Sequence, residues 1–241
     1  MAVRINLQPA YVLHTQPYQN TSLLVDFFCI DHGRMRAVAK GARRQTSRTR
    51  SFLQPFQPLL ISLVGRSELK TLSHVEGSVN AFNLQGVRLF SGLYLNELLV
   101  RLLQWQECHP ALYDSYQQAI IALQGDGNLN VILRRFELSL LDELGYGIDM
   151  EIDSATGLPI ESDAHYLFDP SVGFERVADV ALRTQNISVF SGREIQALKT
   201  LELSERSLSS AARRLTRLAL QPLLGEAPLV SRELFLRQPV S

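Results

Sequence analysis

The first eighty residues of the chain alternate between short apolar runs and turn residues, a pattern that predicts strands rather than helices. Along 34–40 the alternation has a period of two, so Met35, Ala37 and Ala39 are expected to face a core. Turn residues such as Asp31-His32-Gly33 separate the runs. Strands are expected at 11–14, 22–30, 34–40, 59–64 and 69–75. A five-stranded Greek-key barrel of the oligonucleotide-binding (OB) type is the smallest fold that suits this number of strands.

From residue 87 the apolar positions recur with the period of helices that bury one face. Helices are expected at 87–106, 112–123, 129–144 and 207–224. Before the last of these, Ser191 and Glu194 have the spacing of a capping box. The stretch 149–184 is acidic and interrupted by Gly and Pro, which predicts loops or a small hairpin inserted between helices. The predicted fold class is α+β, with an OB domain at 1–80 and a helical domain at 81–241.

The composition is that of an ordinary globular chain. Its 241 residues are 46% hydrophobic and 20% charged, enough to bury a core without disulfide or metal support. No apolar run approaches the ~20 residues of a membrane-spanning helix, and the segment after Met1 lacks the apolar region of a secretory leader. Cys29 and Cys108 make neither a zinc pair nor a disulfide framework. We therefore expect a cytoplasmic protein with no membrane partner and no bound metal.

Charge is distributed unevenly, although the formal net charge is zero. Residues 1–80 contain ten Lys and Arg against four Asp and Glu, and the segment 34–50 contains seven cations and no acid. The alternation along 34–40 places Arg34, Arg36 and Lys40 on one face of a sheet. This segregation indicates a polyanion partner, and the alternative is a solvated basic loop. The candidate contact residues are Arg34, Arg36, Lys40, Arg43, Arg44, Arg48 and Arg50, with Arg66 and Lys70 as neighbours.

Single-strand binding by a small barrel also uses aromatic side chains, on which bases stack. The aromatic residues nearest to these cations in the sequence are Phe27, Phe28, Phe52 and Phe56. We expect Phe27 and Phe28 to lie in the core. Electrostatics should then dominate binding, which predicts weak sequence preference and steep salt dependence.

Patterns of catalytic or cofactor chemistry are absent from the sequence. Neither phosphate-binding glycine pattern occurs, Gly-x-x-x-x-Gly-Lys-Ser/Thr or Gly-x-Gly-x-x-Gly. The five histidines are scattered, with no second metal ligand at helical or turn spacing. Cys108 beside His109 is weak evidence for a thiol nucleophile, and the adjacent acids Asp142 and Glu143 are typical of a solvent-facing helix end. We expect a binding protein that is not an enzyme and needs no cofactor.

Four segments, in the same order along the chain, resemble the RecO family of bacterial recombination mediators. They are Gly41-Ala42-Arg43 after the expected strand, 91–99 (SGLYLNELL), 134–147 (RRFEL running into LGYG) and 231–235 (SRELF). The resemblance implies an N-terminal OB barrel followed by a helical domain. It also implies binding to single- and double-stranded DNA, annealing of complementary strands, and a place in the nucleoid. With RecR as partner, the family helps to load the RecA recombinase onto DNA coated by single-strand-binding protein.

The resemblance further implies that the helical domain receives the acidic C-terminal tail of single-strand-binding protein. A terminal Phe and carboxylate would need an apolar pocket rimmed by arginines. The candidate residues are Arg134, Arg135, Leu138, Leu144, Arg213, Arg214 and Arg217. In the alternative interpretation, Arg134 and Arg135 simply pair with Glu137 or other acids on a helix surface.

The segment after Leu144 departs from the pattern of many family members, which place a four-cysteine zinc site there. Here 149–179 contains no cysteine, so zinc is not expected. Packing of Tyr166, Phe168 and Phe174 must hold this segment instead, or it is partly mobile.

Two other functions fit the same features. An OB barrel with this charge pattern also suits an RNA-binding accessory factor without catalytic activity, because composition does not reveal a preference concerning the 2′-hydroxyl. A metal nuclease is the third candidate, with acid pairs such as Glu151 and Asp153 as its ligands.

Overall fold

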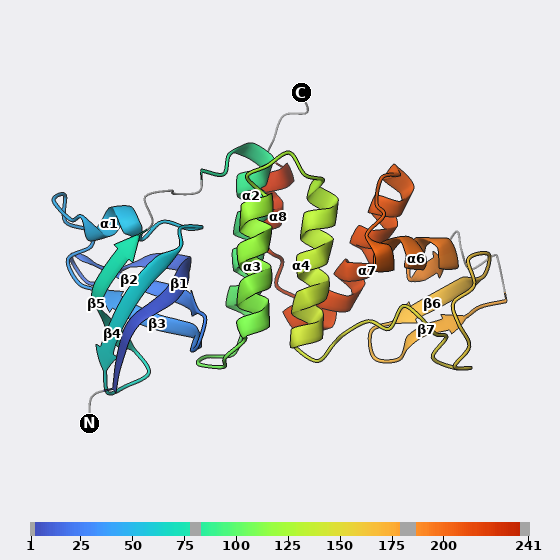
Figure 1. The fold of residues 1–241 in the computed structure, drawn as a ribbon, viewed down its shortest axis with the longest axis horizontal. Coiled ribbons are helices and arrows are strands. Elements are labelled where there is room, and N and C mark those ends of the chain that lie inside the picture. Colours follow the sequence, from blue (N-terminus) through green and yellow to red (C-terminus); the bar gives the residue numbers. More distant parts are fainter. Residues whose placement is uncertain (1–2, 78–82, 179–186, 237–241) are drawn as a thin grey trace. The chain divides into compact units, whose positions relative to one another are not determined.

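The computed structural model describes residues 3–77, 83–178 and 187–236 (Figure 1). The chain forms two compact units, one of residues 1–125 together with 228–241 and the other of residues 126–227. A closed barrel is followed by helices, which confirms the predicted α+β class. The division predicted at residue 80 separates the barrel from the long helices, whereas the first compact unit keeps three of the helices after residue 80 with the barrel. The predicted division stays a prediction. In the described residues no helix is long and apolar enough to cross a membrane.

The first unit is built on a five-stranded barrel with the strand order β1-β2-β3-β5-β4. Its strands are β1 (Val3–Tyr18), β2 (Ser22–Cys29), β3 (Gly33–Ala39), β4 (Leu59–Gly65) and β5 (Lys70–Gly77). β3 and β5 pair in parallel and close the barrel, and the other neighbours are antiparallel. All five predicted strands are present. β1 is much longer than the predicted 11–14, because register shifts after Ile5 and Val12 interrupt the period-two pattern on which the prediction depends.

The barrel interior is filled by alternate residues of each strand. Met35, Ala37 and Ala39 of β3 face inward as predicted, together with Phe27 of β2. Phe28 faces the opposite way and is nevertheless fully buried, because helices cover that side of the barrel.

Two helices, α2 (Gly86–Leu102) and α3 (Pro110–Ala122), supply the cover. Tyr113 and Tyr116 of α3 pack against Tyr11 and Phe28 of the barrel, with ring centroids 5.1 to 6.1 Å apart. Such pairs contribute about 0.5–1.5 kcal/mol each beyond the area that they bury. Burial raises the pKa of Tyr11 to about 12 and also raises the pKa values of Tyr113 and Tyr116. The three hydroxyls therefore stay neutral at physiological pH.

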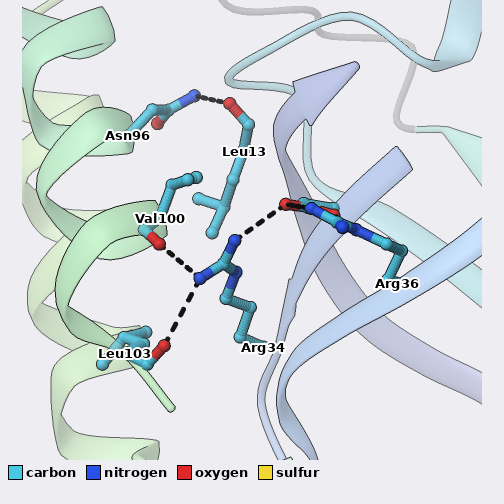
Figure 2. A network of polar contacts seen from close by, with 7 residues as sticks. Leu13, Arg34, Arg36, Asn96, Val100 and Leu103 are labelled. Atoms are coloured by element: carbon cyan, nitrogen blue, oxygen red, sulfur yellow. Dashed lines mark hydrogen bonds and ion pairs between the residues drawn. The ribbon is translucent and has the colours of Figure 1, made fainter. Parts of the chain in front are cut away.

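A buried asparagine joins α2 to β1 at the centre of this contact (Figure 2). The amide nitrogen of Asn96 donates to the carbonyl oxygens of Val12 and Leu13, at 3.3 and 3.1 Å. The hydroxyl of Tyr116 donates to the Asn96 side-chain oxygen at 2.7 Å. The network therefore satisfies buried polar groups from the barrel and both helices.

Asp26, Arg34 and Arg36 form a charged group, termed here the anchor network, at the C-terminal end of α2. Asp26 is buried and accepts hydrogen bonds from Arg34 at 3.0 Å and from Arg36 at 2.5 and 2.8 Å. Arg34 also donates to the carbonyl oxygens of Val100 and Leu103 where α2 ends, as Figure 2 shows. Helix C-termini expose carbonyls without helical partners and attract cations. Arg34 thus fastens the barrel to the end of α2.

The electrostatics of the anchor network favour its charged form. Burial alone would raise the pKa of the Asp26 carboxyl, but hydrogen bonds and charges from Arg36 and Arg34 outweigh it and hold this pKa below the ordinary value. Burial lowers the pKa of the Arg34 guanidinium, an effect that Asp26 partly offsets. The hydrogen bonds that Arg36 donates to Asp26 raise the pKa of Arg36.

The C-terminal helix α8 (Val230–Leu236) returns to the first unit and packs against α2. The carboxylate of Glu97 accepts hydrogen bonds from the backbone N–H groups of Val230 and Ser231, both at 2.8 Å, and from the Ser231 hydroxyl. Phe90 and Phe235 pack edge to face, with centroids 5.9 Å apart. Glu97 therefore satisfies the N–H groups at the start of α8 from within α2.

The second unit joins helices to a three-stranded sheet of order β7-β6-β8. Its elements are α4 (Leu129–Glu143), β6 (His165–Asp169), β7 (Gly173–Arg176), β8 (Val189–Ser191), α6 (Gly192–Thr200) and α7 (Arg206–Leu224). The Ser191–Glu194 capping box is present at the start of α6, as predicted. The end of the predicted insertion, 179–184, lies outside the described residues.

An aromatic cluster holds the segment that lacks cysteines. The rings of Phe168, Phe174 and Phe190 lie with their centroids 5.0 to 6.4 Å apart and are buried. Tyr166 is buried beside them in β6, and its hydroxyl accepts a hydrogen bond from the backbone of Glu161 at 2.9 Å. Packing thus holds this part of the insertion, in line with the first of the two expectations.

Replacing Asp26 tests how far the first unit depends on the anchor network. Asp26→Asn is expected to lower the free energy of unfolding at pH 7 by about 3 kcal/mol, because it leaves the buried Arg34 guanidinium without its carboxylate. Chemical denaturation followed by tryptophan fluorescence measures this, since the single Trp105 lies in the first unit. Glu68→Gln, an exposed carboxylate of the same barrel, is the control and should change stability by less than ~0.5 kcal/mol. Equal effects of the two substitutions would contradict this role.

The pH dependence of the same difference gives a second test. The pKa of Asp26 is lower in the folded than in the unfolded chain. The contribution of its charge to the free energy of unfolding is therefore complete above the ordinary carboxyl pKa of about 4. It is lost as the pH falls through the folded-state value. The stability difference between the parent and Asp26→Asn should therefore shrink below about pH 4. Denaturation curves at several pH values measure it, and a gap that widens on acidification would refute the assignment.

Candidate nucleic-acid interface

The exposed cations of the barrel gather on one connection, termed here the basic loop, residues 40–50. It follows β3 and includes the first two residues of the short helix α1 (Thr49–Phe52). It begins with Gly41 at a φ of +69°, a conformation that favours glycine. Ala42 next to it and Leu53 after α1 are both buried in the barrel core. The backbone N–H of Arg43 donates to the carbonyl of Thr21 at 2.8 Å. Both ends of the loop are therefore anchored, while its polar side chains face outward.

Five cations of the basic loop are exposed: Lys40, Arg43, Arg44, Arg48 and Arg50. Among the described residues none of the five forms an ion pair, and Arg43 donates only to the backbone carbonyl of Gln19, at 3.3 Å. Arg66, in the β4–β5 turn, is exposed as well. These charges are available to an anionic ligand.

The expectation that Arg34 lines an open cationic face is wrong. Only 8% of Arg34 is exposed, because α2 covers this side of β3 and its terminal carbonyls bind the guanidinium. Arg36 is half-exposed, but Asp26 balances its charge through two hydrogen bonds. Alternation along a strand correctly placed both side chains on the outer face, but it does not show what covers that face.

Lys70 is also withdrawn from the surface. It is 6% exposed at the start of β5, and its ammonium group donates to the carbonyl of Ser67 at 2.7 Å. We therefore exclude Lys70 and Arg34 from the interface. The remaining candidates are Lys40, Arg43, Arg44, Arg48, Arg50 and Arg66, with Arg36 at the edge.

The aromatic residues singled out from the sequence offer no stacking surface. Phe27, Phe28 and Phe56 are at most 3% exposed, and Phe52 packs against the barrel core. The exposed aromatic residue next to the interface is instead Trp105, which the sequence analysis missed. The guanidinium carbons of Arg34 and Arg36 lie 3.7 and 4.7 Å from the centroid of its ring. The signal available in the sequence was that Trp105 is the sole tryptophan.

In the second unit, two of the candidate arginines have structural partners. Arg134 is buried in α4 and binds Glu137 through two hydrogen bonds of 2.6 and 2.5 Å, the alternative considered for it above. Arg214 lies 4.3 Å from the ring centroid of Phe190 and donates to the carbonyl of Val189 at 3.0 Å. Both arginines stabilise the fold of this unit.

The other arginines of that set lie on the surface of the second unit. Arg135 of α4 is exposed, as are Arg213 and Arg217, one turn apart on α7. Arg213 donates to the side chain of Asn130 at 3.0 Å, which links α7 to the start of α4. Leu138 and Leu144 are half-buried. The packing of α4 against α7 thus brings exposed cations and partly exposed apolar groups onto one unit.

Two further kinds of site, a metal centre and a reactive thiol, depend on where the His, Cys, Asp and Glu side chains lie. Within 3–77, 83–178 and 187–236, no three His, Cys, Asp or Glu side chains are placed to hold a metal ion. Cys29 is buried in the barrel, and this burial raises the pKa of its thiol. Cys108 is exposed, with its sulfur 3.4 Å from the carbonyl oxygen of Ile30.

Comparison with known proteins adds to this geometry. Residues 1–80 match the family described as "Recombination protein O N terminal", and residues 84–233 match "Recombination protein O C terminal". Proteins named "DNA repair protein RecO" are 42% identical in Haemophilus influenzae (strain 86-028NP), over 229 residues and 95% of each chain, and 43% identical in Shigella flexneri, over 95% of this chain and 93% of the relative. The relative from Tolumonas auensis is 45% identical over 231 residues, 95% of each chain. With a barrel, a helical part and two family matches that together span nearly its whole length, the chain belongs to the RecO family and has a role in DNA repair and recombination.

Proposed function

We propose that this protein is a recombination mediator that binds single- and double-stranded DNA and anneals complementary strands. With RecR, it helps to load RecA onto DNA coated by single-strand-binding protein. It does so as a binding protein of the cytoplasm, at the nucleoid, without catalytic residues or a cofactor. The observation that carries the proposal is the basic loop, with its five exposed cations and no ion pair to a described carboxylate.

The basic loop suits a phosphate backbone rather than a small anion. Its cations extend over eleven positions of the chain and point away from a loop fixed at both ends by Ala42 and Leu53. Phosphates of any sequence present the same charge, so such contacts are independent of sequence. If about five phosphates are neutralised, the logarithm of the binding constant should fall with the logarithm of salt concentration with a slope of about −3.5 for single strands.

Annealing then follows without an active site. Two complementary strands repel each other through their phosphates, and repulsion between unscreened charges slows their encounter. The arginines of the basic loop take the place of mobile counter-ions and bring two strands to the same surface. The barrel would accelerate pairing because it lowers this repulsion, while base pairing itself supplies the specificity.

The second unit suits the acidic tail of single-strand-binding protein. Arg135, Arg213 and Arg217 supply exposed guanidinium groups for carboxylates, and Leu138 with Leu144 supplies apolar surface. Arg134 and Arg214 hold this surface in place through Glu137 and the Phe190 region. Mediator activity on coated DNA would therefore need both units, whereas annealing of bare DNA would need only the first.

Charge reversal of the basic loop tests DNA binding. The double variant Arg43→Glu/Arg44→Glu should weaken binding to all DNA sequences by about tenfold or more near 0.1 M salt and reduce the salt slope by about 1.4. Fluorescence anisotropy of labelled oligonucleotides measures both quantities. Arg176→Glu/Arg193→Glu, which changes the net charge equally at two exposed, ion-paired arginines of the second unit, is the matched control. If the loop variant binds DNA as tightly as the parent, the basic loop is not part of the interface. Tighter binding of RNA than of DNA of equal length would favour the RNA-binding alternative.

Annealing of coated strands tests the second unit. Arg135→Ala/Arg213→Ala should slow annealing of DNA coated with single-strand-binding protein and leave annealing of bare DNA unchanged, because only the coated reaction needs the tail. Binding of the tail itself is measured with a fluorescein-labelled peptide that ends in an acidic stretch and Phe. Each charge-assisted contact that a variant loses should weaken peptide binding by about 1 kcal/mol, roughly fivefold in affinity. Arg134→Ala should instead destabilise the unit and leave peptide binding by the folded protein intact. A peptide that binds the double variant and the parent equally would refute this surface.

A further inference from the structure

We propose that Trp105 is a stacking platform for an unpaired nucleobase of a single strand whose phosphates contact the basic loop. This inference rests on the proposed binding of DNA and adds a contact that distinguishes single strands from duplex. It is carried by the juxtaposition of an exposed tryptophan with Arg34 and Arg36.

Trp105 is unusually exposed for its residue type. Some 42% of it is accessible, whereas the aromatic residues that pack between the barrel and α3, Tyr11, Phe28, Tyr113 and Tyr116, are buried. Arg34 and Arg36 lie over its ring, although the residue as a whole is exposed. An indole held against guanidinium groups presents a flat, polarised surface of the kind on which bases stack.

The backbone holds this tryptophan in a fixed place. The N–H of Gln106 donates to the carbonyl of Arg34 at 2.9 Å, and Trp105 forms a parallel bridge with Arg34. The segment comes so close to β3 that a Cβ at Gly33 would lie 1.6 Å from the carbonyl oxygen of Glu107. Arg34 is itself fixed by Asp26 and by the end of α2. A base that stacks here meets an ordered surface, so little conformational entropy is lost on binding.

The position of Trp105 fits the path of a strand toward the basic loop. Trp105 pairs with β3 at Arg34, and β3 leads directly to Lys40 at the start of the loop. At about 3.3 Å per residue, four residues from Arg36 to Lys40 span about 13 Å. Phosphate contacts at the loop and one stacked base at Trp105 can therefore belong to the same short stretch of single strand. Bases inside a duplex are already stacked and leave Trp105 without a partner.

The native protein provides the first measurement, because Trp105 is its single tryptophan. A dT oligonucleotide should quench the tryptophan fluorescence of the full chain as it binds, in step with the anisotropy of a label on the DNA. Duplex DNA of the same length should raise the anisotropy with little quenching. Anisotropy that rises on single strands without any change in tryptophan fluorescence would overturn the inference and leave the proposed DNA binding intact. No rise in anisotropy with either DNA would instead refute the proposed function.

Substitution supplies the second measurement. Trp105→Ala should weaken single-strand binding by about 5-fold to 150-fold, the range of one stacked base, and leave duplex binding and the salt slope unchanged. Trp105→Phe should recover part of the loss. Tyr146→Ala, an exposed aromatic residue of the second unit, is the matched control and should bind like the parent. A purely structural Trp105 would give equal losses for single strands and duplex, or a lower unfolding temperature with normal binding, and either result would overturn the inference.

Discussion

The guanidinium group of Arg34 is the contact on which the first unit depends, because it bonds to the barrel and to a helix end at once. Its partners are the carboxylate of Asp26 on the neighbouring strand β2 and two backbone carbonyls at the end of α2 that have no partner within the helix. A hydrophobic side chain at position 34 could pack against α2, but it would leave the helix carbonyls without this donor and Asp26 with Arg36 as its remaining cation. The interaction therefore fixes where α2 ends and, through Trp105 and Gln106, the course of the chain beyond it.

Because Arg34 is used internally, the surface charge of the barrel is concentrated in the basic loop. Arg36 pairs with the same carboxylate, and the buried ammonium group of Lys70 donates to a backbone carbonyl. The cations that remain exposed are on a connection whose ends are embedded in the core at Ala42 and Leu53. These apolar anchors thus fix the position of the basic loop, while its exposed charged side chains can adjust to an irregular phosphate backbone.

Much of the fold, but less of the site, could be predicted from the sequence. Period-two alternation identified Met35, Ala37 and Ala39 as core residues, and the Ser191–Glu194 spacing identified the start of α6, because both patterns are local. The burial of Arg34, Lys70 and Arg134 could not be read in the same way. The carbonyls that bind Arg34 lie 66 and 69 residues away, and the pairing of Arg134 with Glu137 was considered, but only on a helix surface, whereas both side chains are buried. Trp105 was missed because an irregular segment after a helix carries no periodic signal.

The return of α8 to Glu97 makes the order of synthesis matter for this chain. Residues 126–227 are translated as one unit between two parts of another, so the barrel, α2 and α3 emerge long before the helix that completes them. Until then Glu97 lacks its N–H donors, and the side of α2 that receives Phe235 stays exposed to water. Nascent chains would therefore carry an unfinished first unit through the synthesis of the second.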